Sequence, residues 1–140
     1  MRTTRRPSIL FAVVLSSAAA ANAGSRVLVE TGRTEYVRYC AACHGVNATG
    51  DGPVASVLHV RPPDLTRIAE RRGGEFPAGE IASVIDGRFE VAAHGTRAMP
   101  VWGRVLGEPI AERTTADEVS RGRIDALVAY LESIQAGSTK

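Results

Sequence analysis

The chain has 140 residues, which is enough for one small domain with a single modest core and leaves no length for a second domain. Its 17 basic and 15 acidic side chains give a formal net charge of +2 at pH 7. A net charge this small gives no large excess of positive charge to attract the phosphates of nucleic acid, and we expect no nucleic-acid partner.

The first 23 residues are predicted to be an export signal. Three arginines among the first six residues precede an apolar run at residues 9–21, and small residues follow up to Ala23. This order is typical of a secretory signal peptide, so we expect cleavage after Ala23 and a mature domain over residues 24–140. A membrane anchor is the alternative, but the run has about 13 residues, whereas roughly 20 are needed to span a bilayer. We therefore expect a soluble periplasmic protein without a membrane anchor after cleavage.

A first helix is predicted before the two cysteines of the chain. Gly32, Tyr36 and Cys40 repeat every four residues, which places them on one stripe of a helix that ends near Cys40. Because glycine has no side chain beyond Cα, Gly32 would let a second helix cross this stripe at close range.

Cys40 and Cys43 lie three positions apart, and His44 follows directly. A disulfide between them would close a very small loop and would constrain the unfolded chain little. A thioredoxin-like redox pair would need a βαβ setting, for which the chain has no run of alternating β-branched residues. A zinc site would need two further ligands, and the remaining histidines, His59 and His94, are not in a second CxxC-like pair.

The remaining interpretation uses the whole CxxCH cluster. Its thiols would add across the two vinyl groups of a haem, and its imidazole would ligate the iron. Thioether bonds at two neighbouring edges of a porphyrin place the next side chain beneath the metal. We therefore predict one covalent haem c, attached through Cys40 and Cys43, with His44 as an axial ligand.

Shorter helices are predicted in the middle of the chain. Asp64 follows two prolines and is a predicted N-cap for residues 65–72, which Gly73-Gly74 would end. Pro77 would open a further helix that Gly87 closes. Gly- and Pro-rich linkers separate these segments, which predicts long loops.

Met99 is the predicted sixth ligand of the iron. It is the only methionine after the predicted cleavage site, and Pro100 biases it away from helical backbone angles, which suits delivery from a loop. The alternatives are a gap-filling core role for Met99 and ligation by His94 or His59. Trp102 could pack on the haem, donate to a propionate or serve the core. Arginines are candidates for propionate contacts (Arg61, Arg97, Arg104) and for a docking patch (Arg67, Arg71, Arg72).

A last helix is predicted near the C-terminus. Five apolar residues fall at helical spacing: Ile124, Leu127, Val128, Leu131 and Ile134. Tyr130 lies alongside them, and Gly137 follows the last turn. The predicted fold class is all-α, with four or so helices and long loops around one covalently attached haem.

The chain resembles the class I c-type cytochromes over nearly all of residues 24–140. The resemblance rests on Gly32, Tyr36, Cys40, Cys43, His44, Gly45, Gly52-Pro53, Met99-Pro100 and residues 127–131. It implies the cytochrome c fold, His44/Met99 axial ligation and electron transfer in the bacterial periplasm. It also implies that the Pro53 carbonyl accepts the other imidazole N–H of His44, with the Pro62-Pro63 pair as the alternative acceptor. The middle (residues 61–88) and an insertion (residues 106–115) are longer than in the shortest members of the family.

Three functions are compatible with these residues. The first is a monomeric or weakly associating one-electron carrier between periplasmic or membrane-bound redox proteins, which is not itself an enzyme. The second is a cytochrome subunit of a larger periplasmic oxidoreductase or respiratory complex. The third is a haem-based peroxidase or gas sensor, in which Met99 would leave the iron.

Overall fold

All regular elements in the described part of the structure are helices, joined by loops. This computed structural model describes residues 9–87, 99, 102–107 and 115–137. Its elements in chain order are α1 (Ile9–Tyr39), α2 (Ala41–His44), the 3-10 helices η1 (Ala55–Val57) and η2 (Leu65–Arg67), α3 (Ile68–Arg71), α4 (Ala78–Asp86), α5 (Trp102–Val105) and α6 (Ala116–Ser133). Within those residues there is no strand, which confirms the predicted all-α class.

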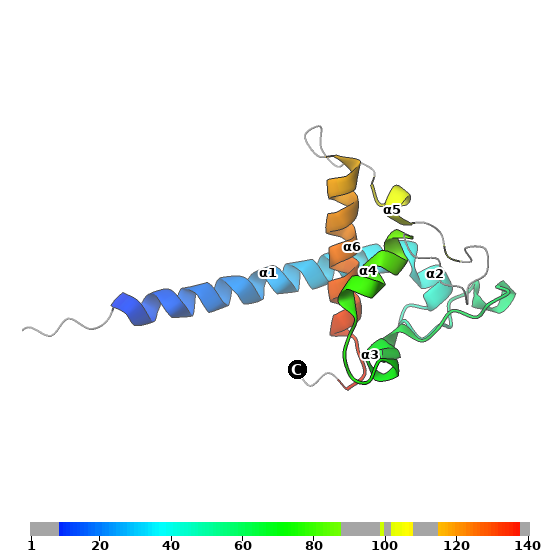
Figure 1. Cartoon of the computed structure of the whole chain (residues 1–140), viewed down its shortest axis with the longest axis horizontal. Coiled ribbons are helices and arrows are strands. Elements are labelled where there is room, and N and C mark those ends of the chain that lie inside the picture. The colour runs from blue at the N-terminus through cyan, green and yellow to red at the C-terminus, as the bar shows by residue number, and fades with distance from the viewer. Residues whose placement is uncertain (1–8, 88–98, 100–101, 108–114, 138–140) are drawn as a thin grey trace, which may run out of the picture.

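Two long helices, α1 and α6, cross to form the framework of the fold (Figure 1). The crossing lies near the C-terminal end of α1, and the N-terminal half of α1 extends away from the other helices. Gly32 makes the close approach possible: a Cβ at this position would lie 1.8 Å from the carbonyl oxygen of Ala126 and 2.9 Å from Cβ of Tyr130. The predicted close crossing at Gly32 is thereby confirmed.

An ion pair also connects the two helices at the edge of this crossing. The Nε atom of Arg123 in α6 lies 4.0 Å from Oε2 of Glu35 in α1, and both side chains are largely buried. Because both charges are withdrawn from water, removal of either partner would leave the other poorly solvated. The ion pair therefore helps to fix the register in which α6 lies on α1.

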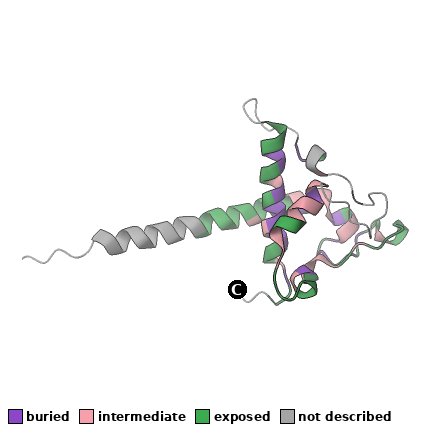
Figure 2. Ribbon diagram, viewed as in Figure 1, coloured by how far each residue is buried: buried purple, intermediate pink, exposed green. Residues whose placement is uncertain are grey.

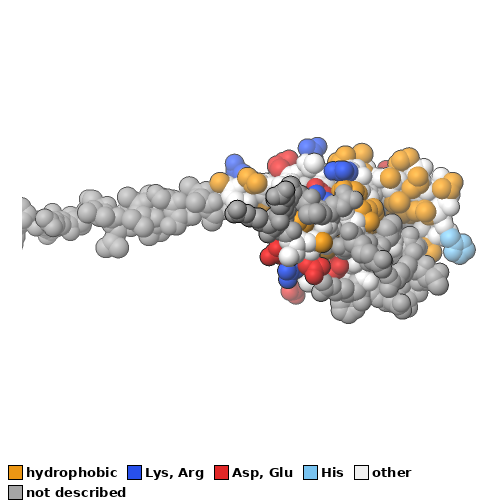
Figure 3. Space-filling model, turned by 90° about the horizontal axis from the view of Figure 1, so that it is seen from above, with side chains coloured by type: hydrophobic (Ala, Val, Ile, Leu, Met, Phe, Trp, Pro, Cys, Tyr) orange, Lys and Arg blue, Asp and Glu red, His pale blue; other side chains and the backbone are white. Residues whose placement is uncertain are grey.

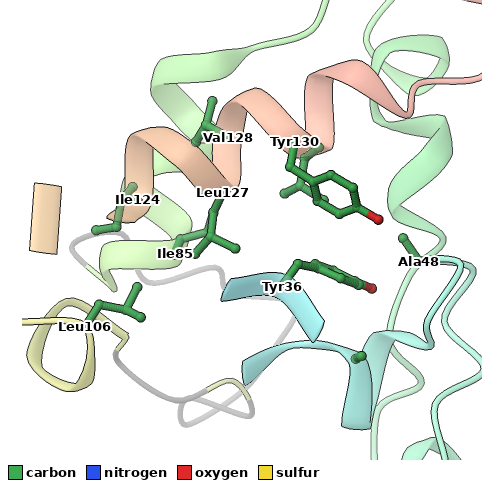
Figure 4. Packing of buried hydrophobic residues seen from close by; sticks show 10 residues of the cluster. Tyr36, Ala48, Ile85, Leu106, Ile124, Leu127, Val128 and Tyr130 are labelled. Carbon is green, nitrogen blue, oxygen red and sulfur yellow. The ribbon is translucent and has the colours of Figure 1, made fainter. Parts of the chain in front are cut away.

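The hydrophobic core follows the apolar stripe of α6. Figure 2 shows buried residues concentrated where α6 meets α1 and α4. Leu127 and Tyr36 are each 1% exposed, and Leu106, just after α5, is fully buried. Figure 4 shows the Tyr36 and Tyr130 rings lying over one another; their centroids are 5.2 Å apart. The predicted inward face of the last helix is confirmed for Ile124, Leu127, Val128 and Leu131, whereas Ile134 is only partly buried.

Local signals set the ends of α6 and α4. Thr115 and Glu118 form a capping box at the start of α6, in which each side chain bonds the other residue's backbone N–H. Gly87, with a left-handed conformation (φ 86°), ends α4 after Pro77 has preceded its first turn. The limits predicted from Pro77 and Gly87 are confirmed.

The segment after Asp64 differs from the single helix that was predicted. The Asp64 carboxylate accepts a bond from the N–H of Thr66 (2.9 Å), which confirms it as an N-cap. The turn that it caps is η2, a 3-10 helix, and the α-helical part covers only Ile68–Arg71. Gly73 and Gly74, both with positive φ, follow this short helix as expected.

α1 continues without a break past Ala23, so the predicted cleavage site lies within a helix. Cleavage itself stays a prediction. In the part of the chain that the structure describes, no helix combines the length and the apolar character needed to cross a membrane.

Candidate functional site

The CxxCH cluster forms one helical turn at the end of α1. α1 ends at Tyr39, Cys40 is the N-cap of α2, and His44 is its last residue. The N–H groups of Cys43 (3.1 Å) and His44 (2.9 Å) both donate to the Cys40 carbonyl. Residues spaced three and four apart on a helical turn face the same side, so this turn presents the two thiols and the imidazole together.

The two cysteines are free thiols, and both are half-buried. Burial, with smaller contributions from Cys43 and Glu35, raises the pKa of Cys40 to about 12. Thiolate, rather than thiol, is the reactive form of cysteine. Burial therefore makes Cys40 a poor exchange nucleophile at neutral pH.

The loop after His44 folds back onto the motif. The Gly50 N–H donates to the His44 carbonyl (2.8 Å), and the Gly52 N–H donates to the Cys43 carbonyl (3.2 Å). A Cβ on Gly52 would lie 2.4 Å from the carbonyl oxygen of Ala42, so only glycine fits this approach. The two glycines of the loop therefore allow its backbone to lie directly against the turn.

Pro53 lies next to the motif because the loop after His44 turns back onto it. Its neighbours Gly52 and Val54 both donate N–H groups to the motif, to Cys43 and to Ala42 respectively. The alternative acceptor, the Pro62 carbonyl, lies against Gly50 instead: a Cβ there would be 2.2 Å from it. The Nδ1 atom of His44 is buried. A bond from this imidazole to the Pro53 carbonyl stays a prediction.

Tyr36 contacts both ends of the motif. Its backbone carbonyl accepts a bond from the N–H of Cys40 (2.8 Å), and its hydroxyl donates to the carbonyl of Gly45 (2.7 Å). Burial is the main cause that raises the pKa of Tyr36 well above its usual range, so the hydroxyl stays protonated. Helical spacing predicts Tyr36 on the stripe of α1, whereas its bond to Gly45 depends on how the loop after His44 folds.

Met99 and Trp102 both pack against the hydrophobic core, and both remain partly exposed. Trp102 begins α5, and its ring lies 5.6 Å from that of Tyr39, centroid to centroid. This contact favours the core-packing alternative for Trp102 and also places Tyr39 against α5. Ligation of the iron by Met99 stays a prediction.

The other residues considered from the sequence fall into three groups. His59 and Arg61 are exposed. All three arginines of the suggested docking patch are exposed, and two of them form ion pairs: Arg67 with Glu70 at 2.6 Å, and Arg72 with Glu80. His94, Arg97 and the side chain of Arg104 lie outside the described residues.

Two residues that hold the site were missed by the sequence analysis. Ala48 is fully buried and has a positive φ of 63°, and its carbonyl accepts a bond from the N–H of Leu65 (2.7 Å). Gln135, only 6% exposed, then bonds the Leu65 carbonyl from beyond α6 (2.8 Å). An alanine in a left-handed turn and a polar residue after a helix are both poor sequence signals. Together they link the loop after His44 to the end of α6.

The described residues contain no group of three or more His, Cys, Asp and Glu side chains that could hold a metal ion by themselves. Comparison with family models gives a match over residues 27–131, to the family described as cytochrome c oxidase, cbb3-type, subunit III. No match is found among curated proteins or among solved structures. The family match covers the CxxCH turn, Met99 and most of α6.

Proposed function

Because the chain belongs to the family of cytochrome c oxidase, cbb3-type, subunit III, whose c-type cytochrome domain carries one covalent haem c, we propose that it is a one-electron carrier of the periplasm. The observation that best supports this role is the single turn that presents Cys40, Cys43 and His44 together. Two thiols and one imidazole on one turn are the donor set that haem c requires.

The partly buried side chains beside the core fit a flat apolar cofactor. Several side chains pack against the buried core but remain only half-buried themselves: Cys40, Leu65, Phe76, Ile81, Met99 and Trp102. A macrocycle against these side chains would bury apolar surface that the protein alone leaves partly in water. Burial of this kind would strengthen the hydrophobic core formed by the described residues.

Each proposed ligand has a distinct role. Cys40 and Cys43 would form the thioether bonds, and His44 would bind one face of the iron. Met99 would bind the other face through its thioether sulfur, which favours the reduced state. The haem iron, when bound, supplies a one-electron couple between its ferrous and ferric states. With His44 and Met99 both in place, the protein leaves no ligand position for dioxygen or peroxide.

The proposed carrier would exchange electrons with periplasmic or membrane-bound redox proteins after export. The predicted signal at residues 1–23 supports the periplasmic location. The carrier is not expected to catalyse a reaction of its own.

A second candidate function is supported by the family description, which names an oxidase subunit. In this alternative the chain would pass electrons within a larger complex rather than diffuse between partners. Exposed apolar side chains are compatible with this: Val57 is 81% exposed and Val46 is 69% exposed. Figure 3 shows hydrophobic side chains gathered at the end of the molecule opposite the free part of α1.

Spectroelectrochemical titration of the haem-loaded protein tests the proposed carrier role. The absorbance should follow one Nernst curve for a single electron, because one haem with two protein ligands has one couple. Carbon monoxide should not bind the reduced protein near neutral pH. Rapid binding of carbon monoxide would contradict the closed coordination and would favour a sensor or peroxidase.

Gel filtration of a periplasmic extract distinguishes a free carrier from a subunit of a complex. A free carrier elutes as a small monomer, and a subunit co-elutes with oxidase activity.

A further inference from the structure

The carbonyl of Gly45, the residue after His44, accepts two hydrogen bonds. The Tyr36 hydroxyl donates to the Gly45 carbonyl at 2.7 Å, and the Ala48 N–H donates to it at 3.1 Å. The first bond comes from a side chain of α1, and the second comes from the loop. The peptide plane between Gly45 and Val46, one peptide beyond His44, is therefore held by both donors.

Gly45 is conformationally permissive, and its backbone is held by hydrogen bonds: its N–H donates to the Ala41 carbonyl (2.9 Å) in addition to the two bonds at its carbonyl. Its φ is 81° and its ψ is 155°, a combination that glycine alone adopts readily. A Cβ at this position would lie 1.9 Å from Oδ1 of Asp51, so the space around Gly45 is closed as well. Without the bond from Tyr36, the Gly45 carbonyl would keep only the loop contact to Ala48.

The donor itself is rigidly placed. Tyr36 is 1% exposed, and its ring packs on that of Tyr130 from α6 with an interplanar angle of 47°. Figure 4 shows both hydroxyl oxygens on the same side, near Ala48. Since α6 also presses on Gly32 one turn earlier, the helix crossing fixes the position of the Tyr36 hydroxyl.

We propose that Tyr36 is a positioning residue for His44: its hydroxyl holds the Gly45 carbonyl and thereby fixes the orientation of the imidazole that ligates the iron. This inference rests on the proposed role of His44 as axial ligand. Through its side chain, Tyr36 connects the α1/α6 crossing to the geometry of the site. Tyr36 is not one of the proposed ligands of the iron, so its effect would be on ligand orientation rather than on electron transfer itself.

The test compares Tyr36→Phe with Tyr130→Phe in the haem-loaded protein. Each change removes one hydroxyl from the same stacked pair, but only the first removes the bond to Gly45. The readout is the spread of the hyperfine-shifted haem methyl resonances in the ferric NMR spectrum, which depends on the orientation of the axial imidazole. The midpoint potential is measured alongside. We expect both readouts to change in Tyr36→Phe and to stay at wild-type values in Tyr130→Phe.

Three outcomes can be told apart. If Tyr36→Phe has the wild-type spread and potential and is only less stable, the residue is merely structural and the proposal is overturned. If the wild-type protein itself lacks a low-spin, histidine-ligated spectrum, the proposed function fails instead. If Tyr36→Phe does not load haem, 3-fluorotyrosine at position 36 decides, because it keeps the ring and makes the hydroxyl a stronger donor. A change in the methyl spread supports the proposal, and an unchanged spread overturns it.

Discussion

Gly32 determines how closely α1 and α6 approach. A Cβ there would meet the Ala126 carbonyl at 1.8 Å, which is backbone and cannot rotate away. We predict that Gly32→Ala lowers the free energy of unfolding of the haem-loaded protein by about 1–3 kcal/mol, because the helices must separate. Gly122→Ala is the matched control, since a Cβ at this α6 position meets nothing within 4 Å. It should be neutral or stabilising by up to about 1 kcal/mol. Equal losses in denaturant unfolding of both variants would contradict this account.

Met99 carries the second prediction at this scale. Replacement of Met99 by Ala removes the proposed thioether ligand, so the weak far-red absorption band of the ferric protein should disappear. The midpoint potential should fall by on the order of 100 mV, since axial ligands shift haem potentials over a span of about 0.8 V. An unchanged band and potential in Met99→Ala would refute Met99 as the ligand, and His94 would then be the next residue to test.

The residues that the sequence predicted correctly are those whose role follows from spacing alone. Gly32 falls on the Tyr36 stripe at helical spacing, and the structure confirms the close crossing there. Cys40, Cys43 and His44 lie on one turn, while their role as haem ligands stays a prediction. Ala48 and Tyr36 acquire their roles only after the loop has folded back and α6 has crossed α1. A positive φ at an alanine is a local cost that tertiary contacts offset, and no sequence pattern signals it.

At the scale of elements, Gln135 joins α6 to the segment before α4. Its Oε1 accepts from the Ala69 N–H (2.9 Å), and its Nε2 donates to the carbonyls of Leu65 (2.8 Å) and Leu131 (2.7 Å). The backbone N–H of Ala136 also donates to the Thr66 carbonyl (2.7 Å). These bonds hold η2 and α3 against the end of α6, and the Leu65–Ala48 bond extends the link to the loop after His44.

Gln135→Ala should therefore destabilise more than its position near the end of the chain suggests. The change leaves the Ala69 N–H and the Leu65 carbonyl without their side-chain partner, which costs roughly 1–3 kcal/mol. Hydrogen exchange at the Ala69 amide should become faster. Glu132→Ala, at an exposed position in the last turn of α6, is the control and should change neither quantity. If the two variants behaved alike, Gln135 would not be the link between these elements.

Element limits could be predicted where a cap is encoded locally. Asp64, Pro77 and Gly87 all act at the ends of the segments that they were expected to limit. The single helix expected after Asp64 is divided into η2 and α3, because the tie to Gln135 and Ala136 fixes this segment from outside. A contact between residues so distant in the chain leaves no local pattern. Most of the predicted insertion at residues 106–115 lies outside the described residues.

At the scale of the whole molecule, the α1/α6 crossing places the CxxCH turn against the core. Tyr36 connects this crossing to Gly45 through its hydroxyl. Met99 and Trp102, more than 50 residues later in the chain than His44, pack against the same core. The all-α class and the paired terminal helices followed from apolar periodicity, whereas the way in which the loops close around the site did not. Loop paths depend on single backbone bonds such as Gly52 to Cys43, which composition does not encode.

The central claim is that Cys40 and Cys43 hold one haem covalently. The most direct measurement is the alkaline pyridine haemochrome spectrum of the purified protein, because pyridine replaces the axial ligands and the band then reports only the macrocycle. We predict the spectrum of a haem with both vinyl groups saturated, and a band shifted toward that of a one-vinyl haem in Cys40→Ser and in Cys43→Ser. A b-type spectrum from the wild-type protein, or haem that acidified organic solvent extracts, would contradict the account.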